Sequence, residues 1–123
     1  MKQFSEAELA KLTCQWLESQ GWETYKEVPC YGGRADIVAV RSRVVWIVET
    51  KLSLSVALMA QCRDRLHQPV HGVLAVVGSG AQRNSILCEW AAMRGIGVAS
   101  CGSRPVLVVA PQLRRTVDPS KLL

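Results

Sequence analysis

Three residues in the first half of the chain have the types and spacing of a site for phosphate chemistry: Asp36, Glu49 and Lys51. Carboxylates bind hard ions such as Mg²⁺ and Mn²⁺, and the backbone carbonyl of Thr50 can complete such a site. A metal held there lowers the pKa of a bound water and stabilises charge on a phosphate in transfer. The ammonium of Lys51 can orient that water or hold the phosphate. The group therefore predicts metal-dependent hydrolysis of a phosphodiester bond.

The segments around these residues are expected to form a β-hairpin, with strands over 34–40 and 44–51 that are rich in β-branched residues. If Ser42-Arg43 forms the turn by itself, Asp36 faces Glu49 across the hairpin. A shift of one residue would move Asp36 to the opposite face of the sheet. Ser-Arg is not a favoured pair for so short a turn, so a longer or bulged turn is the alternative.

The parity of these strands decides whether the three side chains can act together. Because side chains alternate along a strand, Glu49 and Lys51 share one face, and the short turn puts Asp36 on that face too. The alternative interpretation is a structural pair of carboxylates that Lys51 neutralises. Opposed acids repel each other at the end of an apolar hairpin unless a cation accompanies them, which favours the metal site.

The hydrophobic pattern of the whole chain predicts the order α-β-β-β-α-β-α-β-β, with turns over 29–33 and 78–80. The turn Gly78-Ser79-Gly80 lacks the following Lys-Ser/Thr of a phosphate-binding loop. This order implies an α/β fold with a mixed central sheet flanked by helices. The length fits a single domain over 1–123, and we expect a basic, loosely ordered tail over 111–123. The expected helices are 6–20, 54–66 and 81–94, and the further strands are 22–28, 72–77, 97–100 and 105–110.

One pattern in the chain resembles the motif of the PD-(D/E)xK restriction-endonuclease-like superfamily. It consists of Gly33-Arg34-Ala35-Asp36, twelve further residues and then Glu49-Thr50-Lys51. The expected order α-β-β-β-α-β resembles the common core of these nucleases, and the likeness covers about residues 5–77. Ala35 replaces the proline of the motif, which is a common relaxation. The resemblance implies an Mg²⁺-dependent (or Mn²⁺-dependent) deoxyribonuclease in which Asp36 and Glu49 bind metal and Lys51 assists catalysis.

Three further residues are candidates for the same site. Gln61 lies ten residues beyond Lys51 and resembles the glutamine that follows this strand in exonuclease-like members; the alternative is an ordinary polar helix position. Glu27 is expected at the end of the first strand, where many such nucleases carry an extra acid, or else as a surface carboxylate. Glu8 lies on the first helix, where a capping box with Ser5 is the favoured interpretation.

The net charge of +5 and the pI near 9.2 favour a polyanionic partner such as DNA. If Arg34, Lys51, Arg63 and Arg65 line one cleft, they hold the phosphate backbone; otherwise they form a solvated face. The five cysteines lack the spacing of a zinc site or a disulfide framework and indicate reduced thiols in a cytoplasmic compartment. No apolar run is long enough to span a membrane.

The main alternative to an enzyme is a catalytically silent nuclease-fold module that binds nucleic acid or a protein. A weaker alternative is an accessory subunit of a larger DNA-processing complex, and a homodimer would suit cutting of two strands. The residues are equally compatible with single-stranded, duplex or branched DNA, with RNA, and with endonuclease or exonuclease action. Compactness favours a prokaryotic or phage source, with the protein acting in the cytoplasm of the cell.

Overall fold

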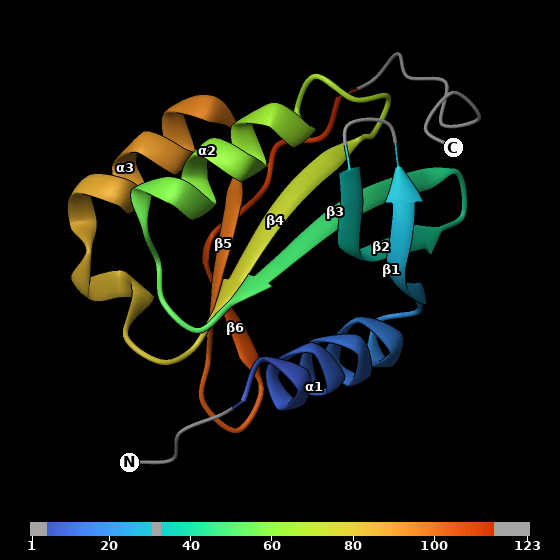
Figure 1. Cartoon of the computed structure of the whole chain (residues 1–123), viewed down its shortest axis with the longest axis horizontal. Coiled ribbons are helices and arrows are strands. Elements are labelled where there is room, and N and C mark those ends of the chain that lie inside the picture. Colours follow the sequence, from blue (N-terminus) through green and yellow to red (C-terminus); the bar gives the residue numbers. More distant parts are fainter. Residues whose placement is uncertain (1–4, 31–32, 115–123) are drawn as a thin grey trace.

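The computed structural model describes residues 5–30 and 33–114, which form an α/β fold around one mixed sheet (Figure 1). The six strands lie in sequence order, β1-β2-β3-β4-β5-β6. Strands β3, β4 and β5 are parallel, and the β1-β2, β2-β3 and β5-β6 pairs are antiparallel. The helices are α1 (Glu6–Ser19), α2 (Val56–Arg65), α3 (Ser85–Arg94) and the 3-10 turn η1 (Ala81–Arg83), and the strands are β1 (Glu23–Cys30), β2 (Gly33–Arg41), β3 (Val44–Lys51), β4 (Gly72–Val77), β5 (Gly97–Cys101) and β6 (Pro105–Val109).

Each face of the sheet has its own hydrophobic core. Helix α1 covers one face, where Leu9 and Leu17 pack with alternate residues of the central strands such as Val48. Helices α2 and α3 cover the other face, where Leu58 packs with the remaining residues such as Ile47 (Figure 1). All six residues of β4 are buried, as expected for a parallel strand between two helical layers. The predicted mixed sheet flanked by helices is confirmed.

The β2-β3 hairpin has the predicted register. Ile37 pairs with Val48 and Arg41 pairs with Val44, so the turn contains only Ser42 and Arg43. Ser42 has a φ of 55°, the left-handed conformation that so short a turn demands. The backbone therefore accepts an unfavoured residue type at this turn, and the register places Asp36 across from Glu49.

Two predicted boundaries are wrong. The turn expected over 29–33 is shorter, because β1 continues through Pro29 to Cys30. Proline is tolerated there since β1 is an edge strand, and residues 31–32 lie outside the described residues. The helix expected over 81–94 is interrupted at Asn84, whose side chain accepts a hydrogen bond from the Leu87 N–H and starts α3.

The last described residues are fixed to the body of the protein. The amide of Gln112 donates to the carbonyl of Gly95, and the amide of Arg114 donates to the carbonyl of His71. The guanidinium of Arg114 also donates to the carbonyls of Leu66 and Gln68. The tail predicted as loosely ordered over 111–123 is thus bound over its first four residues, and residues 115–123 lie outside the described residues.

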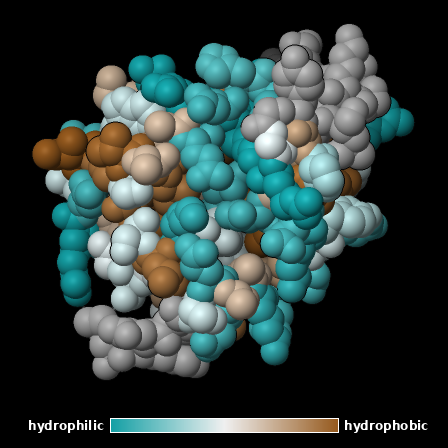
Figure 2. Space-filling model, in the orientation of Figure 1, coloured by the Kyte–Doolittle hydropathy of each residue, from teal (hydrophilic) through white to brown (hydrophobic). Residues whose placement is uncertain are grey.

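The surface in the view of Figure 1 is mostly hydrophilic, with hydrophobic side chains gathered over the α2 and α3 layer (Figure 2). Val56 of α2 and Ile86 and Met93 of α3 are all more than two-thirds exposed. In the described part of the chain, no helix is long and apolar enough to cross a membrane.

Candidate active site

Asp36 lies where β2 separates from β3. The ladder between these strands is regular as far as Ile37 and Val48. Beyond that pair, the Oδ2 atom of Asp36 accepts hydrogen bonds from the Thr50 amide at 2.8 Å and the Thr50 hydroxyl at 3.5 Å. The Asp36 carboxylate thus occupies a position that a backbone carbonyl takes in a continuous ladder, and this fixes its orientation.

Glu49 is completely buried and has a specific partner for each oxygen. Its Oε1 accepts from Nε of Arg65 at 2.8 Å, and its Oε2 accepts from Nε2 of Gln61 at 3.2 Å. Nη2 of Arg65 donates in turn to the carbonyl of Arg34 at 2.7 Å. The predicted participation of Gln61 in the site is thus matched by a direct contact to Glu49.

The electrostatics of Glu49 show that it is close to Asp36. Burial, in the first place, and the negative charge of Asp36, in the second, together raise the pKa of Glu49 to about 7. The nearby Arg65 opposes this shift without cancelling it. Two carboxyl groups this close favour a proton on Glu49 or a bound cation beside the pair.

A cleft of about 370 Å³ opens beside Asp36, between α1, the middle of β1, β2 and the end of β3. At its mouth, Nζ of Lys51 lies 3.6 Å from Oε1 of Glu6. The cleft brings together three acids and two lysines. Its lining residues are Glu6, Ala7, Ala10, Lys26, Glu27, Asp36, Thr50 and Lys51.

Glu49 does not line this cleft, so the prediction that Asp36, Glu49 and Lys51 present one common face is wrong in part. Glu49 points to Arg65 and Gln61 of α2, whereas Lys51 pairs with Glu6 of α1. Lys51 is the last residue of β3, so its long side chain can pass the strand end and reach the other layer. Asp36 links the two sides, since it borders the cleft and its charge acts on Glu49.

Glu27 lies inside β1, not at its end as predicted. The pairs Lys26-Ile37 and Val28-Ala35 on either side place Glu27 opposite Asp36. Glu27 has a φ of 52°, an uncommon conformation for a residue other than glycine that is often found at functional sites. It lines the cleft.

Among the acids of α1, Glu6 and not Glu8 reaches the cleft. Glu8 forms the capping box with Ser5, which confirms the favoured interpretation of that residue. Sequence reasoning missed Glu6 and Lys26. Glu6 and Ala10 are one helical turn apart, so the sequence places them on one face of the helix. It does not indicate that this face is the one that borders the cleft.

The basic residues proposed for nucleic-acid binding do not share one cleft. The Arg65 side chain is only 5% exposed and is committed to Glu49. Arg63 pairs with the exposed Asp64 and borders an apolar groove between α2 and α3. Arg34 is exposed and donates to the Glu27 carbonyl. The reason is helical geometry: Arg63 and Arg65 are two residues apart and leave α2 in different directions.

The donor set is compatible with a divalent cation. Within residues 5–30 and 33–114, no group of three or more His, Cys, Asp or Glu side chains is gathered closely enough to hold a metal. However, Mg²⁺ typically binds through one or two carboxylates, with waters and substrate phosphates as its other ligands. Asp36 and Glu49 offer such a pair, and each carboxylate keeps lone pairs beyond those used by Thr50, Gln61 and Arg65.

The comparisons with known proteins establish the fold alone. No protein-family model and no curated protein matches this sequence. The structure resembles that of a protein of unknown function from Silicibacter pomeroyi, with a TM-score of 0.71 and 15% sequence identity. The likeness covers 96% of this chain and 79% of the other. At this low sequence identity, the likeness shows that the two proteins share a fold and gives no information about activity.

Proposed function

We propose that this protein is a metal-dependent nuclease that hydrolyses phosphodiester bonds in DNA, with a restriction-endonuclease-like core. The observation that carries the proposal is the coupled carboxyl pair of Asp36 and Glu49 at the opened end of β2 and β3, beside Lys51. Arg65 neutralises only one of these two charges, so two acids placed together here are unfavourable as a purely structural arrangement. They are a good device for holding a cation against a phosphate.

The surrounding residues divide the work of the site. When bound by Asp36 and Glu49, a divalent ion would activate water and offset charge on the phosphate. Thr50 fixes the Asp36 carboxylate through its amide. Gln61 and Arg65 of α2 fix the Glu49 carboxylate. With both carboxylates held in this way, neither Asp36 nor Glu49 would need to change its orientation during the reaction.

Lys51 is suited to contact the scissile phosphate or the attacking water. Its side chain is half exposed at the cleft, and its partner Glu6 is more than half exposed, so their ion pair is weak and easily exchanged for a phosphate. Lys26 adds a second positive charge to the cleft wall. Together with the net charge of +5, these lysines support a polyanionic substrate.

One observation favours the alternative, a silent nuclease-fold module that binds nucleic acid or a protein. Both oxygens of Glu49 already accept hydrogen bonds from α2, and Glu49 is fully buried. In such a module the Arg65 guanidinium would replace the metal as the permanent counter-ion of Glu49. The nuclease and the catalytically silent module therefore differ in whether Glu49 still contributes to a cation site.

A cleavage assay separates these functions. Labelled linear, circular, single-stranded and branched DNA would be incubated with Mg²⁺, Mn²⁺ or EDTA and with wild type, Asp36→Asn or Lys51→Ala. Asparagine can still accept from the Thr50 amide, so the fold is kept while the carboxylate is lost. We expect metal-dependent cutting that falls at least ~100-fold in both variants.

The matched control is Asp64→Asn, which removes an exposed acid that pairs only with Arg63. It should cut like the wild type. Equal cutting by Asp36→Asn would overturn the proposed site. Binding of DNA without cutting under any condition would establish the silent module instead.

A further inference from the structure

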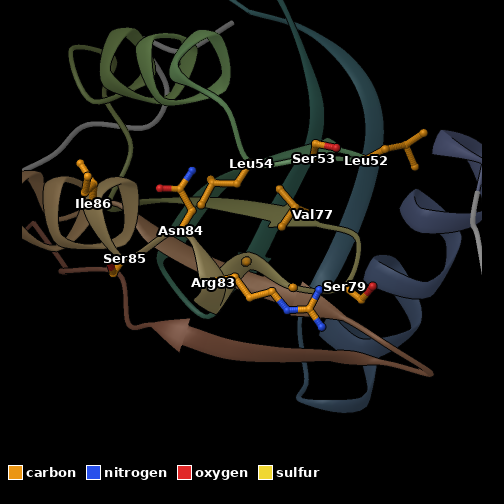
Figure 3. A pocket seen from close by; sticks show the side chains of 11 residues that line it. Leu52, Ser53, Leu54, Val77, Ser79, Arg83, Asn84, Ser85 and Ile86 are labelled. Carbon is orange, nitrogen blue, oxygen red and sulfur yellow. The ribbon is translucent and has the colours of Figure 1, made fainter. Parts of the chain in front are cut away.

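A second cavity, of about 410 Å³, lies beyond the carboxyl ends of β3 and β4 (Figure 3). Ligands of α/β proteins commonly bind outside this end of parallel strands. Lys51 lines the cleft and Leu52, the next residue, lines the second cavity. The two cavities therefore flank the same end of β3. The lining residues of the second cavity are Leu52, Ser53, Leu54, Val77, Ser79, Gly80, Ala81, Arg83, Asn84, Ser85 and Ile86.

The loop over 78–81, which lines this cavity, is held in place by the half-buried hydroxyl of Ser100. Oγ of Ser100 accepts from the amides of Gly80 at 3.1 Å and Ala81 at 3.5 Å, and donates to the carbonyl of Gly78 at 3.1 Å. A Cβ at Gly78 would lie 2.8 Å from the carbonyl oxygen of Leu52, so the loop needs glycine to approach β3 this closely. The Ser100 hydroxyl and the close approach at Gly78 therefore fix the path of this loop beside the end of β3.

Arg83 gives the cavity its charge. Its guanidinium lies against Gly80, whose added Cβ would be 3.6 Å from Nη1, and its side chain extends toward Ser79 (Figure 3). The lining contains no acid, and none of the described acids lies within ion-pair distance of Arg83. The hydroxyls of Ser53, Ser79 and Ser85 and the amide of Asn84 add neutral polar groups to the lining, and Ser79 lies nearest the guanidinium in Figure 3.

We propose that this Arg83 pocket binds a backbone phosphate of the nucleic acid whose neighbouring phosphate enters the cleft; this assignment of the ligand rests on the proposed nuclease function. A guanidinium presents a fork of donors that matches a phosphate, and serine hydroxyls commonly add to such contacts. The side chain of Ile86, 77% exposed at the rim, offers an apolar surface for a sugar or base. The Gly78-Ser79-Gly80 turn shapes the wall of this pocket without being a phosphate-binding loop.

The test is the affinity of fluorescent single-stranded and duplex oligonucleotides in EDTA, measured by anisotropy over a series of salt concentrations. Arg83→Ala should weaken binding severalfold to about tenfold and lower the slope of log affinity against log salt by about 1. The matched control is Arg43→Ala, at the turn before β3 and so at the far end of that strand. It should leave the affinity and the slope unchanged.

A second pair of variants guards against a change in folding. Ser85→Glu places a negative charge at the pocket, while an acid in the first turn of a helix is favourable for α3 itself. It should weaken binding more than Ser85→Ala does. Circular dichroism melting of both variants would confirm that they fold.

The outcomes of the binding and cleavage experiments are distinguishable. Equal affinities for Arg83→Ala and Arg43→Ala overturn the pocket, whether or not the wild type cuts DNA. Binding that depends on Arg83 without any cutting keeps the pocket and overturns the nuclease. A wild type that cuts DNA with Mg²⁺ but binds no oligonucleotide in EDTA overturns the pocket alone.

Discussion

Two arginines near the carboxyl end of β3, Arg65 and Arg83, are in opposite situations. Arg65 is buried, and its guanidinium is committed to Glu49 and to the carbonyl of Arg34. Arg83 is exposed beside a cavity whose lining holds no acid. The same residue type thus fixes the buried carboxylate of Glu49 in one place and leaves a positive charge without an acidic partner among the described residues in the other. The difference comes from the partner, which the residue type alone does not reveal.

Arg65→Met tests the buried member of this pair and should have the largest effect on stability. Removing Arg65 leaves Glu49 buried without its counter-ion, which typically costs about 3–5 kcal/mol. Chemical denaturation in urea, monitored by tryptophan fluorescence, measures the change. The cost should be greater at pH 8 than at pH 6, because protonation of Glu49 removes the unpaired charge.

The double variant Glu49→Met/Arg65→Met sharpens this test. Replacing a buried pair by apolar side chains is often close to neutral, so the double variant should be more stable than Arg65→Met alone. Arg63→Met, on the same helix but exposed, should change stability by less than about 0.5 kcal/mol. A loss for Arg63→Met as large as that for Arg65→Met would contradict the comparison.

The raised pKa of Glu49 predicts how stability depends on pH. The folded value of about 7 lies above the ordinary value of 4.5, so between these pH values the folded state holds more protons than the unfolded state. The free energy of unfolding of the metal-free protein should therefore fall as pH rises from about 4.5 to 7, by up to ~3 kcal/mol, and level off above that.

Comparison of variants isolates this contribution from other titrating groups. Unfolding would be measured across the same pH range for wild type, Glu49→Gln and, as a control, the exposed Glu89→Gln. The free energy of unfolding should fall with pH in the wild type and in Glu89→Gln, and this dependence on pH should be lost in Glu49→Gln. An identical slope in all three proteins would remove Glu49 as its source.

Local patterns were sufficient to predict the hairpin and its register. The short spacing between two β-branched segments fixed which residues pair, and alternation then placed Asp36 across from Glu49. The capping box of Ser5 and Glu8 was likewise readable from adjacent residues. These features depend on interactions within a few residues of the chain or across one tight turn.

Features that depend on packing between distant elements were not predictable. The pairing of Glu49 with Arg65 requires the path of α2 across the sheet, and the contact of Lys51 with Glu6 requires the position of α1. The left-handed backbone of Glu27 has no signal in its residue type, since glycine would be expected there. Motif spacing therefore predicted that Asp36 and Glu49 lie together, but it did not predict which residues pair with Glu49 and Lys51.

Arg83→Met tests the exposed member of the pair and should have the smallest effect on stability. Because no described acid pairs with Arg83, its removal breaks no ion pair and should change the free energy of unfolding by less than about 0.5 kcal/mol. Urea denaturation alongside Arg65→Met gives the comparison directly. A large loss would show that Arg83 supports the fold of the loop, and the charge would then be structural in both places. A small loss leaves ligand binding as the role that distinguishes Arg83 from Arg65.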